Sequence, residues 1–239
     1  MTEKQVDMTI WQHLEELRKR LLHSLIALVI GVVISIVFAD YLLEVLARPI
    51  GGFDRLLSIQ IAENLSVYFR VTLLSGFIIS LPFILIQLYF FIAPGLKQEE
   101  RKWVLISVPI ASIFFILGAV FAYFVMLPAA IPFLVEFPGP NVLPKWKDYV
   151  NFVTSLIFWI GISFETPLIM FVLAKLGIID AKGLAKHWRF AVIFIAVVAA
   201  VATPTPDPIN MILLMLPLLF LYFLGILLAA LAEPKENKE

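Results

Sequence analysis

The chain has 239 residues, of which 62% are hydrophobic and 15% are charged. A typical soluble domain is about 25% charged, so this composition excludes an ordinary soluble fold and favours a protein embedded in a bilayer. The formal net charge is zero, which argues against a generic nucleic-acid-binding protein. The chain has no cysteine and its three histidines are scattered, so we expect no disulfide, no metal site and no cofactor.

A membrane-spanning helix needs about 20 apolar residues, and the sequence contains six apolar stretches that reach or approach this length. We predict an all-α membrane protein that forms a single integral membrane domain over residues 1–239. Its expected parts are a cytoplasmic amphipathic segment at 1–20, spans at about 21–39, 71–96, 103–127, 149–174, 190–202 and 211–232, and a charged tail at 233–239.

The segment before the first span has the pattern of an amphipathic helix. Thr9–Gln12 has the form of a capping box, which predicts a helix start. Ile10, Leu14, Leu17 and Leu21 then share one face at helical spacing. We expect this helix to lie on the membrane and to turn into the first span.

The third apolar stretch is too long for one simple span. Trp103–Val135 measures about 50 Å as a helix, against a hydrocarbon core of about 30 Å. Because proline disrupts helices, we expect Pro128 and Pro132 to break it at the far face. The proline-rich segment that follows, up to Pro144, should cover that face.

The fifth and sixth helices are expected to be short. Phe190–Ala202 is only about 20 Å long as a helix. Thr203–Pro208 contains three prolines, which force a turn. One interpretation is a hairpin whose turn does not reach full bilayer depth. In the alternative, the fifth helix begins earlier, near Ala185, and its cationic side chains reach back to the interface.

The lysines and arginines predict the orientation. Six spans place both termini on one side, and cations are more frequent on the cytoplasmic side of membrane proteins. The terminal side would hold Lys4, Arg18, Lys19, Arg20, Lys97, Arg101, Lys102, Lys175, Lys182, Lys186, Arg189, Lys235 and Lys238. The opposite side would hold Arg48, Arg55, Arg70, Lys145 and Lys147. Both termini are therefore predicted to be cytoplasmic.

Glu165 is the one charged residue between Tyr149 and Ala174. A carboxylate at the centre of a bilayer costs about 2.5–3.5 kcal/mol on insertion scales, so we expect it to face a polar group rather than lipid. Pro167 allows the helix to bend beside it. Three roles remain open for Glu165: contact with a partner or substrate on a concave face, a hydrogen bond to a neighbouring helix such as one from Gln87, and a structural kink.

Two acidic pairs are predicted to lie on the cytoplasmic face. Glu15 and Glu16 each precede a cation by four residues, and Glu99 and Glu100 stand at the start of the third span. Carboxylates held at helix ends suit a guanidinium ligand, which they bind bidentately. Ordinary intrahelical pairing and capping of the third span are the competing interpretations.

Several motifs together resemble the TatC family, the large multispanning subunit of the twin-arginine translocase. They match in family order, from about residue 9 to 225. These motifs are His13–Leu21 (HLEELRKRL), Gln87 with the segment Phe91–Leu96 and Glu100–Arg101, Phe164–Pro167 (FETP), Thr203–Pro208 (TPTPDP), and the prolines Pro49 and Pro82. The last periplasmic turn has one residue more than in some relatives.

The resemblance implies a curved, glove-like wall of helices in the cytoplasmic (inner) membrane. It implies a non-enzymatic receptor for folded proteins that carry twin-arginine signal peptides, driven by the proton motive force. Acids matching Glu16 and Glu100 contact the arginine pair of the signal in that family.

Other positions of the same motifs are predicted to contribute to these sites. They are His13, Arg18 and Arg101 for the signal peptide, Glu165 and Gln87 for an intramembrane partner site, and Thr203, Pro204 and Asp207 for the periplasmic turn. The implied partners are TatA- and TatB-type single-span subunits, signal peptides of folded cargo, membrane lipid and further copies in an oligomeric receptor complex, with no nucleic acid.

Two other classes of function compete with this one. An ion- or proton-coupled transporter of small solutes could use Glu165 and Asp207. An intramembrane enzyme has less support, because these two acids are expected at different depths and no histidine has an obvious serine partner.

Overall fold

The computed structural model describes residues 10–135, 143–202 and 208–233. Within these ranges the chain is almost entirely helical. The long elements are α1 (Ile10–Val37), α3 (Ile61–Ile92), α4 (Gln98–Phe121), α6 (Trp146–Phe164), α7 (Thr166–Lys175), α9 (Trp188–Ala202) and α10 (Pro208–Ala232). The shorter ones are α2 (Ala39–Ala47), η1 (Arg48–Ile50), η2 (Phe53–Arg55), η3 (Ala93–Gly95), η4 (Ala122–Met126), α5 (Leu127–Val135) and α8 (Ala181–Lys186).

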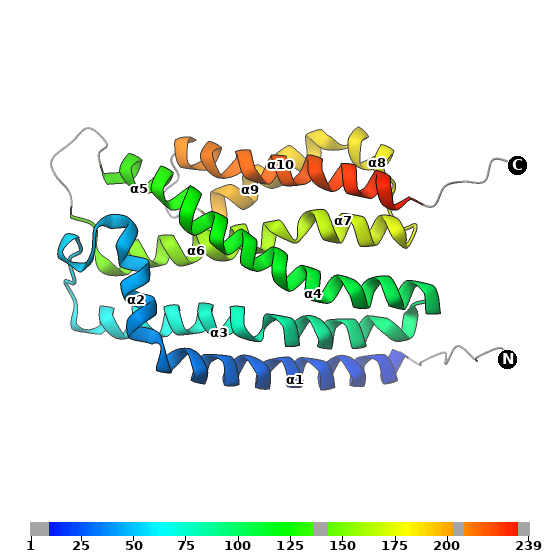
Figure 1. The fold of residues 1–239 in the computed structure, drawn as a ribbon, viewed down its shortest axis with the longest axis horizontal. Coiled ribbons are helices and arrows are strands. Elements are labelled where there is room, and N and C mark those ends of the chain that lie inside the picture. The colour runs from blue at the N-terminus through cyan, green and yellow to red at the C-terminus, as the bar shows by residue number, and fades with distance from the viewer. Residues whose placement is uncertain (1–9, 136–142, 203–207, 234–239) are drawn as a thin grey trace, which may run out of the picture.

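The long helices stand side by side as a broad wall, with α1 at one edge and α9 and α10 at the other (Figure 1). The start of α1 and the end of α10 lie at the same end of the wall, together with η3 and the start of α4. We call this the terminal end, and the end that holds α2 and the start of α6 the opposite end. Both ends of the described chain are therefore on one side, as six spans require.

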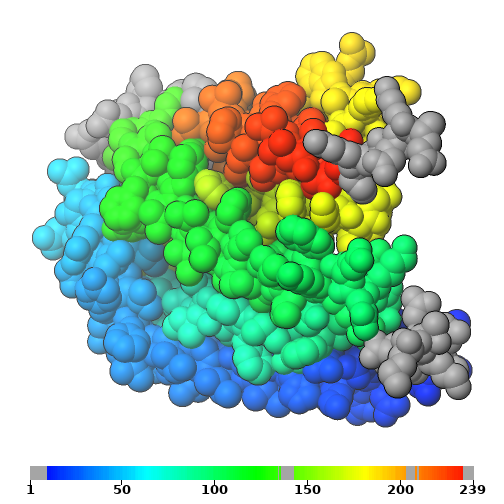
Figure 2. All heavy atoms as spheres, turned by 45° about the vertical axis from the view of Figure 1, so that its right-hand side comes forward, coloured from blue at the N-terminus to red at the C-terminus, as the bar shows by residue number. Residues whose placement is uncertain are grey.

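Burial decreases from the middle of the wall to its edge. In the span formed by α6 and α7, 44% of the most apolar stretch is buried, against 11% in α1. The surface of α1 lies along the rim of the molecule (Figure 2), and Leu25, Val29 and Val33 on it are each more than half exposed. Such a face suits lipid rather than water.

Within the described residues, five segments are long and apolar enough to cross a bilayer, and α9 is a shorter apolar helix. The five are Ile10–Val37, Ile61–Gly95, Gln98–Phe133, Trp146–Lys175 and Asn210–Ala232. The predicted all-helical fold and its short fifth helix are confirmed. The sixth helix is not short, because α10 begins at Pro208, where proline suits a first turn, and runs for 25 residues.

Small residues bring the helices into close contact at two places. A Cβ added to Gly31 of α1 would lie 2.4 Å from the carbonyl oxygen of Gly76 on α3. A Cβ on Gly118 of α4 would lie 2.9 Å from the Cα of Gly161 on α6. Backbones this close leave no room for a side chain, so these glycines fix α1 on α3 and α4 on α6.

The N-terminal helix is continuous, which corrects one expectation. No turn separates the amphipathic segment from the first span, since α1 runs unbroken from Ile10 to Val37. The chain bends instead at Phe38, where α2 starts. Thr9, the expected capping residue, lies outside the described residues.

The expected break at Pro128 and Pro132 is wrong, because the chain stays helical to Val135. A π-helical turn, η4, comes just before these prolines. Proline clashes with the carbonyl four residues earlier, which for Pro128 is that of Phe124, inside η4. The wider π turn accommodates this clash without ending the helix. The segment expected to cover the far face lies largely at 136–142, outside the described residues.

The fourth span is interrupted where the sequence predicts a bend. α6 ends at Phe164 and α7 begins at Thr166, with Glu165 between them and Pro167 in the first turn of α7. The fifth helix begins at Trp188, after the separate helix α8. This start is between the two positions considered, and the turn at 203–207 lies outside the described residues.

The second span begins ten residues earlier than predicted, at Ile61. Arg70 therefore lies inside α3, not in the loop before it. The opposite end is held by Tyr123 and Tyr149, whose hydroxyls donate to the carbonyls of Val45 (2.7 Å) and Leu46 (2.8 Å) at the end of α2.

Candidate functional site

A cluster of charged and polar side chains joins α1 to α3 at the terminal end. The Arg20 guanidinium donates from Nε to Oε1 of Glu16 at 2.7 Å, and its Nη2 lies 2.6 Å from the same oxygen. Its Nη1 donates to Oε1 of Gln87 at 3.2 Å. Gln87 is buried, and the side chains of Glu16 and Arg20 are only 21% and 24% exposed. Arg20 therefore bridges an acid on α1 and an amide on α3.

Two aromatic residues of α3 support this cluster. The Arg20 guanidinium lies over the ring of Phe90, 4.9 Å from its centroid. The His13 ring stacks on Phe91 with centroids 4.5 Å apart. These contacts fix the first turns of α1 against the end of α3, so the Glu16 carboxylate is held in one place.

Glu100 is held in a different way, by the start of its own helix. Its Oε2 accepts a hydrogen bond from the Lys97 backbone N–H at 2.9 Å, and its Oε1 lies 3.8 Å from the Lys97 Nζ. The Arg101 Nε donates to the Leu96 carbonyl oxygen at 3.1 Å. Glu100 thus caps α4, as one of the two interpretations expected.

The two neighbouring acids differ from Glu16 and Glu100. Glu15 and Glu99 are exposed, whereas Glu16 and Glu100 are half-buried and held by local contacts. Arg18, also predicted for the site, is exposed on α1. The family motifs singled out Glu16 and Glu100, and the structure adds the physical difference within each pair: the first acid of each pair is exposed and the second is held by local contacts.

Glu165 lies where α6 meets α7, and its carboxyl group faces α4. It is close to the backbone of Phe115, and its Oε1 is buried without a hydrogen-bond partner among the described residues. Gln87 bonds to Arg20 at the terminal end instead. The structure therefore does not bring these two predicted residues together, and a hydrogen bond from Gln87 to Glu165 is not formed.

The third predicted group lies outside the described residues. Thr203, Pro204 and Asp207 belong to the segment 203–207, so their role remains a prediction.

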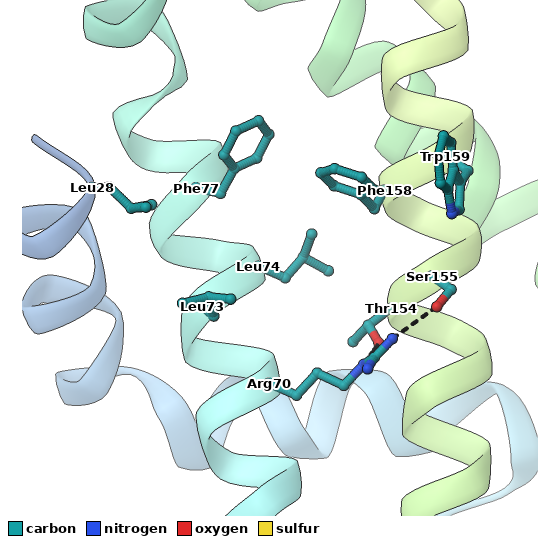
Figure 3. A pocket seen from close by; sticks show the side chains of 9 residues that line it. All are labelled: Leu28, Arg70, Leu73, Leu74, Phe77, Thr154, Ser155, Phe158 and Trp159. Carbon is teal, nitrogen blue, oxygen red and sulfur yellow. Dashed lines mark hydrogen bonds between the residues drawn. The ribbon is translucent and has the colours of Figure 1, made fainter. Parts of the chain in front are cut away.

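A pocket of about 360 Å³ opens between α3 and α6 (Figure 3). It is lined by Leu28 of α1, by Arg70, Leu73, Leu74 and Phe77 of α3, and by Thr154, Ser155, Phe158 and Trp159 of α6. Arg70 lies at one end of the pocket and reaches across to α6. The sequence predicts Arg70 outside the second span, on the opposite side, and only the early start of α3 reveals its position.

The Arg70 side chain is bonded entirely to neutral groups. Its Nε donates to Oγ1 of Thr154 at 2.7 Å, and its Nη2 donates to Oγ of Ser155 at 2.8 Å and to the Asn151 carbonyl oxygen at 3.4 Å. No acidic side chain in the described parts of the chain forms an ion pair with it.

The wall of apolar helices and the end cluster define a multi-pass helical membrane protein with a cluster of polar side chains at one end. Residues 12–217 match the family model described as "Sec-independent protein translocase protein (TatC)". The chain belongs to this family.

Named relatives are similar in sequence to this chain over nearly its full length. The chain is 37% identical over 232 residues to the Sec-independent protein translocase protein TatC of Carboxydothermus hydrogenoformans, covering 96% of each chain. It is 38% identical over 229 residues to that of Deinococcus radiodurans, covering 92% of this chain and 85% of the relative.

The fold also matches a solved structure described as the twin arginine translocase receptor TatC. The TM-score is 0.82 at 35% identity, with 92% of this chain and 99% of the solved chain covered. A second structure of that receptor, in the detergent DDM, gives a TM-score of 0.83. The expectation of a TatC-like architecture is confirmed.

Proposed function

We propose that this chain is the receptor and core subunit of a twin-arginine translocase, and that it binds twin-arginine signal peptides at its terminal end. Membership of the TatC family supports the assignment to a twin-arginine translocase. The observation that supports this binding site is the position of Glu16 and Glu100. They are distant in sequence, but the helices that hold them start at the same end of the wall. Both are half-buried carboxylates held by local contacts.

Each carboxylate keeps the capacity to bind a further guanidinium. A carboxylate offers about four lone-pair sites. Both contacts of Arg20 use Oε1 of Glu16, so Oε2 is left without a partner among the described residues. Glu100 accepts one backbone hydrogen bond and has a distant lysine at 3.8 Å. A signal arginine can therefore join either acid without displacing its present partner.

The existing contacts lower the entropic cost of binding. A free glutamate loses rotamer freedom when it binds a ligand, whereas the contacts of Glu16 with Arg20, and of Glu100 with Lys97, already restrict the two side chains. Such preorganisation increases affinity because less ordering remains to be done. His13 and Arg18 are on the same helix as Glu16, and Arg101 follows Glu100 on α4, so these three side chains would contact other parts of the signal.

The orientation and partners follow from the same proposal. The terminal end faces the cytoplasm of an inner membrane, where signal peptides first meet the translocase, because most lysines and arginines lie there. Single-span TatA- and TatB-type subunits pack against the wall, in an oligomeric receptor complex. Glu165 makes a polar contact with one of these subunits within the bilayer. The chain itself catalyses no covalent chemistry.

Photo-crosslinking tests the signal site directly. A photoreactive residue is placed at the exposed positions Glu15 and Glu99, beside the two acids, and the protein is mixed with a twin-arginine signal peptide or its twin-lysine variant. Lysine keeps the charge but loses the planar fork of donors, so we expect strong crosslinks to the twin-arginine peptide and weak ones to the variant. Equal crosslinking of both peptides would show that the terminal end does not discriminate arginine from lysine.

A further inference from the structure

The pocket beside Arg70 has the polarity of a phospholipid, and we propose that it binds one phospholipid with its phosphate on Arg70 and an acyl chain between α3 and α6. The site is separate from the signal site, since Arg70 is 17 residues from Gln87 along α3, which is about 25 Å of helical rise.

The first line of support is the unused hydrogen-bonding capacity of Arg70. A guanidinium has five N–H donors, and three hydrogen bonds are made by Nε and Nη2. Nη1 has no partner in the part of the chain that the structure describes. The charge itself is also without an ion-pair partner there. A phosphate oxygen supplies both an acceptor and a negative charge, and guanidinium pairs with it bidentately.

The hydroxyls around Arg70 favour the same ligand. Thr154 donates its hydroxyl to the Val150 carbonyl at 2.6 Å and so presents a lone pair to Arg70. Ser155 accepts from Arg70 and makes no other hydrogen bond within the described ranges, so its own proton is available. The guanidinium is held by α6 while its remaining donors, with the Ser155 hydroxyl, can point at one anion.

The depth of Arg70 fits a headgroup. The span that includes α3 covers 35 residues, about 52 Å of helix against a hydrocarbon core of about 30 Å. An upright, centred helix projects about 11 Å beyond the core at each end, and Arg70 is about 14 Å from Ile61 by helical rise. It therefore lies close to the boundary between hydrocarbon and headgroups at the opposite end, within reach of a lipid phosphate.

The apolar part of the pocket runs from Arg70 toward the middle of the bilayer. Leu73, Leu74 and Phe77 follow Arg70 along α3, and Phe158 and Trp159 follow Ser155 along α6 in the same direction (Figure 3). The Phe77 and Phe158 rings meet at 5.6 Å between centroids and form the inner wall. A phospholipid has the same order, with its phosphate at the surface and its chains pointing to the midplane.

The dimensions favour a lipid chain over a helix of another protein. The lining residues of α3 extend from Arg70 to Phe77, about 10 Å along the helix axis. A helix is about 10–12 Å wide with its side chains and needs a groove of several turns, whereas the pocket holds about 360 Å³. Part of one acyl chain fits this space, and the rest of the chain would extend into the bilayer.

Native mass spectrometry of the purified full chain tests the proposal. The probe is dioleoyl phosphatidylglycerol, and dioleoylglycerol, which lacks the phosphate, is the matched control lipid. We expect the wild type to retain one phosphatidylglycerol, and Arg70→Gln to weaken this binding about tenfold or more, since charge-assisted hydrogen bonds are lost. Dioleoylglycerol should bind equally weakly to both proteins.

Two further variants separate the site from a folding defect. Leu74→Trp adds bulk on the side of α3 that faces α6 in the pocket (Figure 3), and it should also abolish retention. Arg48 is a cation of the opposite end that pairs with Glu44 outside the pocket, so the Arg48→Gln variant should bind lipid like the wild type. Unchanged retention by folded Arg70→Gln or Leu74→Trp protein would overturn the proposal. If Arg70→Gln kept the lipid but lost a co-purified single-span subunit, the partner of Arg70 would be a carboxylate of another helix.

Discussion

The two sites of the wall, the acids of the terminal end and Arg70 of the opposite end, hold their charges in opposite ways. At the terminal end, Glu16 and Glu100 each have a cation of their own chain beside them, Arg20 at 2.6 Å and Lys97 at 3.8 Å. At the opposite end, Arg70 has only hydroxyls and a carbonyl as partners.

This difference separates two kinds of site. A carboxylate with its own counter-ion stays charged and oriented without a ligand, so it can bind and release a signal peptide repeatedly. A guanidinium without a counter-ion near the hydrocarbon boundary has unsatisfied charge, so a constant companion such as a lipid suits it better.

The largest effect is expected from breaking the close contact between the middle of α3 and α1, which holds α1 in place at the terminal end. Gly76→Val would place its Cβ 2.6 Å from the backbone nitrogen of Val32. Overpacking costs about 1–3 kcal/mol and more where the backbone must move. Thermal unfolding of the purified protein should show strong destabilisation or no folded protein, with α1 released from α3. Gly95→Val, where nothing lies within 4 Å of the added Cβ, is the control and should unfold close to the wild type.

Glu165 tests whether a third polar group acts between the two ends. Its unpartnered Oε1 predicts a polar contact with a partner or signal helix. Glu165→Gln should keep much of the export activity, while Glu165→Ala loses it and still folds. Failure of both variants would indicate proton transfer, and full export by the alanine variant would remove Glu165 from the mechanism.

A smaller effect is expected from the hydroxyl that orients Arg70. Thr154→Val removes the 2.7 Å acceptor for the Arg70 Nε and should lower the free energy of unfolding by about 1 kcal/mol. Thr72→Val is a matched control, because the equally buried Thr72 hydroxyl bonds only to carbonyls of its own helix. Equal destabilisation of the two variants would show that Arg70 gains nothing from Thr154.

The smallest effect is expected at an exposed ion pair of the opposite end. Arg48 and Glu44 are 3.3 Å apart, and their side chains are 58% and 60% exposed. Such pairs contribute about 0–1 kcal/mol, so Arg48→Gln should leave the unfolding temperature almost unchanged. A large loss would mean that exposed pairing alone stabilises this end, which would weaken the contrast with Arg70.

The apolar stretches predicted the spans because composition and length decide what crosses a bilayer. Pro167 also predicted the interruption at Glu165, since a proline in the first turn starts a new helix. The predicted helix break at Pro128 was wrong for a physical reason. The energetic cost of a proline inside a helix depends on the turn before it, and η4 widens that turn. The start of α3 was missed because the polar residues of its first turns, such as Glu63, hide a helix that extends beyond the bilayer core.

The residues of the signal site could be predicted from the sequence only where a family motif contains them. Glu16 and Glu100 were identified by their place in family motifs, but their local partners were not, because the approach of Arg20 to Gln87 depends on how α1 packs on α3. The pocket at Arg70 has no sequence signal, since Thr154 and Ser155 are 84 and 85 residues away.

The central claim is that Glu16 and Glu100 together bind the arginine pair of a signal peptide. The direct measurement is the Kd of a labelled twin-arginine peptide for two double variants. Gln can still accept the capping bond at Glu100, so Glu16→Gln with Glu100→Gln removes the charges and keeps the fold. Its matched control is Glu15→Gln with Glu99→Gln, which removes the same charge from the exposed neighbours.

We predict that the first double variant raises the Kd about 100-fold or more, since two charge-assisted contacts of about 1.5–3 kcal/mol each are lost. The control should change the Kd by no more than about twofold, because exposed charges contribute little at physiological salt. Equal weakening by both variants would mean that the acidic face attracts the signal only by its overall charge. An unchanged Kd in the first variant would contradict the claim outright.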